Sequence, residues 1–93
     1  MARIELTQYL MPDGRTTKVH FEGSDELAAM VHELAGKGLA LECEVLQTRE
    51  VSVTMASEDE DVGIVVVPNG PGVAEAAEGM IREVYARAQA GEL

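Results

Sequence analysis

Residues 62–72, Val62-Gly63-Ile64-Val65-Val66-Val67-Pro68-Asn69-Gly70-Pro71-Gly72, join an apolar run to a turn rich in proline and glycine. The nearly uninterrupted apolar run predicts a strand that is either covered on both faces or left with an exposed apolar face. The strand must end at Pro68, because the Pro68–Gly72 segment can only form a tight connection. A helix is expected from Val73 to about Ala90, since apolar residues share one stripe, namely Val73, Ala77, Met80, Ile81, Val84 and Ala88.

The two segments before this run alternate between apolar and polar residues, which is the period of a half-buried strand. Residues 39–46 predict one strand, in which carboxylates occupy the outer side and Cys43 the inner side. Residues 51–55 predict the next strand, after a turn at residues 47–50. The acidic segment Ser57–Asp61 then predicts a polar hairpin loop.

The N-terminal part predicts a hairpin followed by a helix. Residues 3–10 and 16–22 alternate as strands, and Met11–Arg15 holds a proline and a glycine suited to a turn with a bulge. Ser24 is a good N-cap for a helix, because its hydroxyl can accept a free backbone N–H. That helix is expected to end within residues 35–38, where glycine permits a left-handed cap.

The order ββαβββα predicts the α+β class. We expect residues 1–93 to form one acidic domain, since 93 residues leave room for a single core. The expected architecture is a two-layer sandwich with a mainly antiparallel five-stranded sheet and both helices on one face.

The sheet face away from the helices is the most informative feature that this pattern predicts. Alternation places carboxylates there beside exposed apolar groups, a mixture typical of a protein-binding or dimerising surface. The partner-binding candidates are Glu5, Tyr9, Glu42, Glu44, Leu46 and Val65.

The composition disfavours several classes of partner. The net charge of −10, from 17 acidic and seven basic residues, repels phosphate backbones and anionic lipids. An αβββα segment has the order of double-stranded RNA-binding domains, but the stretch that would hold phosphates near the start of its second helix carries Glu75 and Glu78 and no lysine. We therefore expect neither direct nucleic-acid binding nor membrane binding.

Cysteine usage and the N-terminal residues predict a cytoplasmic protein. Cys43 is the single cysteine, so neither an internal disulfide nor a cysteine-based zinc cluster can form. Met1–Leu10 lacks the basic patch and apolar run of a secretion signal, and no stretch reaches the roughly 20 apolar residues of a membrane span.

No group of residues predicts catalysis, a metal or another cofactor. His20 and His32 have no second histidine or cysteine at ligand spacing. Ser57–Asp61 lacks the glycine and the spaced ligands of a calcium loop. Cys43 is expected to fill the core, and the Pro68–Gly72 turn has no lysine, arginine or hydroxyl beside it to hold a phosphate.

Two segments, Ile4–Arg15 and Pro68–Gly72, resemble parts of small uncharacterised bacterial proteins associated with phage or plasmid sequences. The resemblance spans most of the chain and implies an accessory or inhibitor role. It implies no activity, cofactor or catalytic residue.

The sequence therefore predicts a non-enzymatic module that binds another protein, either a basic one or a second copy, through its acidic sheet face and loops. One alternative is an acidic mimic that occupies the basic groove of a nucleic-acid-binding protein, as some phage inhibitors do. Another is a domain that binds a small ligand or a metal.

Overall fold

The computed structural model describes residues 2–5, 8–10, 12–17 and 20–93, with side chains for residues 3–4, 12–15 and 21–93. The strands are β1 (Ala2–Glu5), β2 (Gln8–Leu10), β3 (Thr16–Thr17), β4 (His20–Gly23), β5 (Ala40–Val45), β6 (Glu50–Ala56) and β7 (Asp61–Pro68). The helices are α1 (Asp25–Gly36) and α2 (Gly72–Gln89). The α+β class and the ββαβββα order are confirmed, with each of the first two predicted strands observed as two shorter ones.

The strands form two separate sheets, so the prediction of one five-stranded sheet is wrong. β1 and β4 pair antiparallel as a small sheet. The larger sheet has the order β3-β2-β5-β6-β7, in which β5, β6 and β7 are antiparallel and β2 joins β5 in parallel. The predicted N-terminal hairpin is thus divided, because its base packs on α1 while its tip extends the larger sheet.

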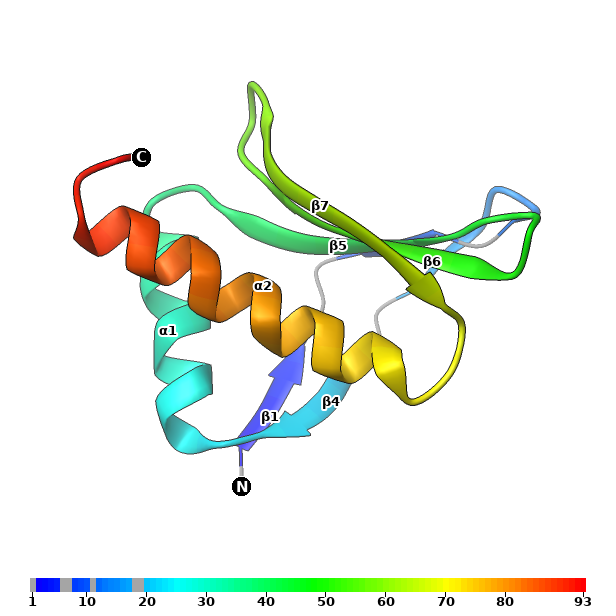
Figure 1. Ribbon diagram of the computed structural model, residues 1–93, viewed down its shortest axis with the longest axis horizontal. Helices are drawn as coiled ribbons and strands as arrows, with labels where there is room; N and C mark the ends of the chain where they lie inside the picture. Colours follow the sequence, from blue (N-terminus) through cyan, green and yellow to red (C-terminus); the bar gives the residue numbers. More distant parts are fainter. Residues whose placement is uncertain (1, 6–7, 11, 18–19) are drawn as a thin grey trace.

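The helices lie below the larger sheet in Figure 1, and α2 crosses β6 and β7. α1 packs against α2 and β1 and makes a smaller contact with β5. Arg82 of α2 lies 3.6 Å from Glu26 of α1, an exposed ion pair across the helix contact. The core between these layers comes from the predicted apolar stripes, and its most completely buried side chains are Leu27, Leu34, Val51, Val53, Met55, Ile81 and Val84.

Local signals in the sequence account for the helix ends. The Ser24 hydroxyl accepts the backbone N–H of Leu27 at 3.1 Å, which confirms the predicted N-cap. Gly38 has φ of +82° just beyond α1, the left-handed conformation that glycine adopts without strain. Neither α1 nor α2 combines the length with the apolar character that crossing a bilayer requires.

The small sheet depends on Gly23, which lies at the end of β4 against α1. A Cβ on Gly23 would collide with Ile4 Cδ1 and would approach Leu27 Cδ2 to 3.1 Å. Both side chains are buried, so a methyl group on residue 23 would have to displace Ile4 from its place against α1.

We predict that Gly23→Ala lowers the free energy of unfolding by about 1–3 kcal/mol, the usual cost of overpacking a core. Gly36→Ala is the matched control, because a Cβ there meets nothing within 4 Å and alanine favours the helix by up to about 1 kcal/mol. Urea denaturation of both variants measures the difference. Equal stability of the two variants would contradict the packing of the small sheet on α1.

Candidate protein-interaction surface

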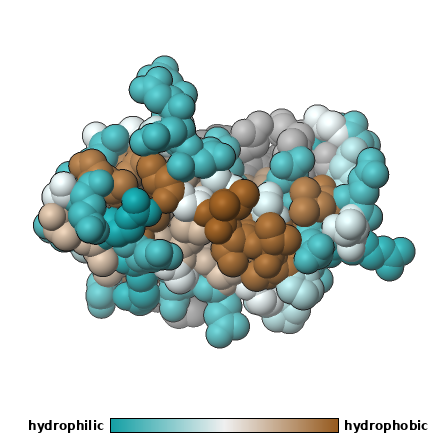
Figure 2. Space-filling view, turned by 45° about the horizontal axis from the view of Figure 1, so that its top comes forward, coloured by the Kyte–Doolittle hydropathy of each residue, from teal (hydrophilic) through white to brown (hydrophobic). Residues whose placement is uncertain are grey.

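β7 carries the largest exposed apolar side chains of the described residues. Ile64 is 63% exposed, Val65 37% and Val66 46%, and Leu93 near the C-terminus is the other large exposed apolar residue among them. The face brought forward in Figure 2 shows hydrophobic surface near its middle, bordered by hydrophilic groups. An apolar cluster on the surface, edged by charge, is typical of an interaction site.

A β-bulge decides which of these side chains lie on the outer face. Ala56 pairs with Asp61, but Met55 pairs with Gly63, so Val62 is an extra residue in β7. This one-residue shift places Val65 opposite Val53, whose side chain is buried on the helix side. The expected position of Val65 on the outer face is therefore wrong, because the prediction contained no bulge.

Ile64 and Val66 occupy the outer face in place of Val65. The signal in the sequence is Gly63, since an isolated glycine within a strand indicates a bulge or a close approach of another backbone or side chain. A Cβ on Gly63 would lie 2.8 Å from Met80 Sδ, so the glycine allows α2 to pack closely on β7.

The outer face forms two rows across β5, β6 and β7. Glu42 pairs with Thr54, which pairs with Ile64, and the adjacent row contains Glu44, Ser52 and Val66. Glu44, Ile64 and Val66 are exposed, whereas Ser52 in the middle of its row is only 8% exposed. The face is therefore acidic along β5 and apolar along β7.

The structure brings some of the other predicted residues to this face and separates others from it. Leu46 follows directly after β5 and is half-buried, and its backbone N–H donates to the carbonyl of Glu50 at 2.8 Å. Glu5 belongs to β1 in the small sheet, where its backbone pairs with His20 and not with the strands of the face. Tyr9 lies in β2, next to Cys43 of β5. The side chains of Glu5 and Tyr9 are outside the described residues.

Cys43 lies on the inner side of β5, as its alternation predicts, and is 3% exposed. Burial raises the pKa of its thiol from an ordinary value of 9.0 to about 11. The thiolate is the nucleophilic form of cysteine, so this residue is protonated and unreactive at neutral pH. Core packing is the role that its position supports.

We predict that iodoacetamide at pH 8 modifies Cys43 slowly in the folded protein and rapidly in urea, as measured by intact mass. Because the folded-state pKa is the higher one, the unfolded chain loses this proton first as the pH rises. Cys43 therefore reduces the free energy of unfolding between pH 9.0 and about 11. Over that pH range, Cys43→Ala should lose less free energy of unfolding than the wild-type chain. An equal loss in both proteins would contradict the raised pKa of Cys43.

The other groups considered for chemistry do not assemble into a site. Ser57 closes the acidic loop, since its backbone N–H donates to the carbonyl of Glu60 at 2.8 Å and its hydroxyl accepts the N–H of Glu60 at 3.2 Å. His32 is exposed on α1, and the side chain of His20 is outside the described residues. In the ranges with described side chains, no three histidine, cysteine or acidic residues lie together as metal ligands would.

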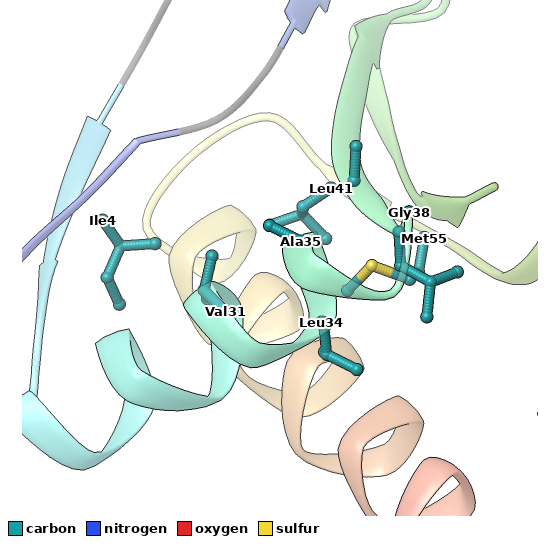
Figure 3. A pocket seen from close by; sticks show the side chains of 9 residues that line it. Ile4, Val31, Leu34, Ala35, Gly38, Leu41 and Met55 are labelled. Carbon is teal, nitrogen blue, oxygen red and sulfur yellow. The ribbon is translucent and has the colours of Figure 1, made fainter. Parts of the chain in front are cut away.

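Two hollows flank the larger sheet. The first, of about 310 Å³, opens between α1 and the start of β5 (Figure 3). Its lining is apolar and contains no titratable side chain, with Ile4, Val31, Leu34, Leu41 and Met55 among its walls. The second is a groove of about 470 Å³ between α2 and β7, beside Ile64 and Val65. The groove continues the exposed apolar surface of β7 onto the helix side.

No protein-family model matches this chain, and neither the curated proteins nor the solved structures include a significant match.

Proposed function

We propose that this chain is a non-enzymatic protein-interaction module that binds another protein through the outer face of β5–β7. The observation that supports this proposal best is the exposure of Ile64 and Val66 in the same rows as Glu42 and Glu44. The proposed binding surface consists of Glu42, Glu44 and Leu46 together with Ile64 and Val66.

The two halves of this surface would make different contributions. Burying a large aliphatic side chain completely stabilises a complex by about 1.5–3 kcal/mol, so the side chains of β7 would supply affinity. The carboxylates of β5 would supply orientation and selectivity, because charges at the rim of an interface steer a complementary partner. A partner with apolar residues next to lysine or arginine fits this arrangement.

The proposed role involves no catalysis. A catalytic nucleophile must be available in its reactive form, whereas burial keeps the Cys43 thiol protonated. His32 lies exposed on α1, outside both hollows. These positions support binding as the activity of the chain.

An acidic mimic of nucleic acid is the alternative function that the net charge of −10 suggests. Such a mimic would bind its target mainly by charge, and its affinity would fall steeply as salt increases. The apolar half of the face favours a mixed interface, for which the dependence on salt is shallower. Affinity measured against salt concentration separates these two modes.

We predict that the double variant Glu42→Lys/Glu44→Lys loses a protein that the wild-type chain retains from a lysate of its source cells. The matched control is Glu58→Lys/Glu60→Lys, which makes the same charge change in the exposed loop between β6 and β7. Affinity capture with quantitative mass spectrometry compares the three proteins. A protein captured equally by all three, or lost equally from both variants, would contradict the proposed surface.

A further inference from the structure

β7 is a long free edge of the larger sheet. It contains eight residues, whereas β3 at the other edge contains two. An exposed edge strand usually carries a lysine, a central proline, a β-bulge or an inward-pointing charge. Each of these hinders pairing with a second strand. The bulge at Val62 and the hydrogen bond from Arg87 to the Val62 carbonyl, at 2.7 Å, protect the start of β7. Residues 64–67 contain none of these protections, since all four are aliphatic.

The pairing of β6 with β7 determines which backbone groups point away from the sheet. Asn69 N–H donates to Arg49 O at 3.0 Å, just beyond the pair of Pro68 with Glu50. In an antiparallel ladder, that bond makes Pro68 and Glu50 a non-hydrogen-bonded pair. Hydrogen-bonded and non-hydrogen-bonded pairs alternate along the ladder, so Val67, Val65 and Gly63 bond to β6. The N–H and C=O groups of Val66 and Ile64 therefore point to the free edge.

We propose that β7 pairs with β7 of a second copy of this chain, antiparallel, about a two-fold axis that passes beside Val65. Val66 of one copy then lies opposite Ile64 of the other, and the two exchange backbone hydrogen bonds. The two copies of Val65 form the non-hydrogen-bonded pair at the axis. This register uses the free N–H and C=O groups of both Ile64 and Val66.

A second copy fits this edge because the edge is complementary to itself. Ile64 meets Val66 on the outer face, and Val65 meets Val65 on the helix side. Gly63 lies opposite Val67, and residues 63–67 contain no carboxylate, so no two carboxylates meet within the paired segment. Closed two-fold dimers with a self-complementary patch are the commonest oligomers of soluble proteins.

The groove beside β7 leaves room for the second copy. Ala76 and Gly79 of α2 line it together with Val65, and Glu83 and Arg87 contribute charges of opposite sign. A Cβ on Gly79 would meet nothing within 4 Å among the described residues, so this position leaves the groove open.

This inference rests on the proposed function in one respect, because it makes a second copy one partner of the same apolar strand. The dimer would join two larger sheets into one continuous sheet. Glu42 and Glu44 lie on β5, two strands away from the proposed contact, so both copies keep them accessible for a further protein.

A pair of cysteine variants tests the register. Val65→Cys places two thiols in a non-hydrogen-bonded pair, with Cα atoms about 4.5 Å apart, within disulfide range. In Val66→Cys the two thiols are offset by two residues along adjacent strands, so the Cα atoms lie about 8 Å apart, beyond that range. We expect Val65→Cys to form a covalent dimer at least about tenfold faster than Val66→Cys under mild oxidation.

The backbone hydrogen bonds are tested by Val66→Pro, with Val66→Thr as its matched control. Proline removes the outward N–H of residue 66 without touching the bonds to β6, and edge strands accept it. Threonine keeps that N–H. In sedimentation equilibrium, we expect Val66→Pro to dimerise at least about tenfold more weakly than Val66→Thr, which corresponds to about 1.4 kcal/mol.

The response to salt separates this dimer from binding to a basic protein. Two copies of charge −10 repel each other, so raising the salt from about 0.1 M to about 1 M should strengthen the dimer by shortening the Debye length from about 10 Å to about 3 Å. Binding of a basic partner should weaken over the same range.

A wild-type chain that stays monomeric at every protein and salt concentration, with Val65→Cys and Val66→Cys oxidising at equal rates, would overturn the inference. A covalent link from Val65→Cys to a different protein, without a dimer, would also overturn it and would indicate an extended segment of that protein at the edge. If Val66→Pro fails to fold, the cysteine pair decides alone. The Glu42→Lys/Glu44→Lys comparison is independent of each of these outcomes, so failure of the dimer and failure of the proposed function can be told apart.

Discussion

The close contact between Gly63 of β7 and Met80 of α2 determines how the larger sheet meets its helix. The position of a Cβ on Gly63 is 2.8 Å from Met80 Sδ, so a larger residue there would force the Met80 side chain to move. Gly63 also follows the extra residue Val62, at which the pairing of β7 with β6 shifts by one. The shift turns Ile64 and Val66 outward and Val65 towards the helix side, and the exposed apolar surface of the chain follows from it.

Burial is distributed unequally over the strands of this sheet. Val51 and Val53 of the interior strand β6 are completely buried, because strands flank them on both sides and α2 covers them. β7 is just as apolar, but it lies at the edge, and Ile64 remains 63% exposed. A small domain has few elements with which to cover an edge strand. An apolar strand exposed in this way is the feature on which the proposed dimer rests.

Charge and apolar surface have opposite effects on association in this molecule. A net charge of −10 makes copies of the chain repel one another. Residues 62–67 carry no charge, and the carboxylates of the outer face lie on β5. The proposed contact at β7 would therefore avoid direct repulsion between strands and would leave Glu42 and Glu44 accessible to the solvent.

Most of the local structure follows from signals between residues that are close in the chain. Ser24 begins α1, Gly38 ends it, and the apolar stripes of both helices and the alternation in residues 39–46 identify the sides that face the core. The sheet that each N-terminal strand joins depends on pairing between distant segments, which leaves no periodic signal in the sequence. The outward side of β7 likewise depends on the tertiary structure, because a run of apolar residues has no alternation and one bulged residue reverses every side chain that follows.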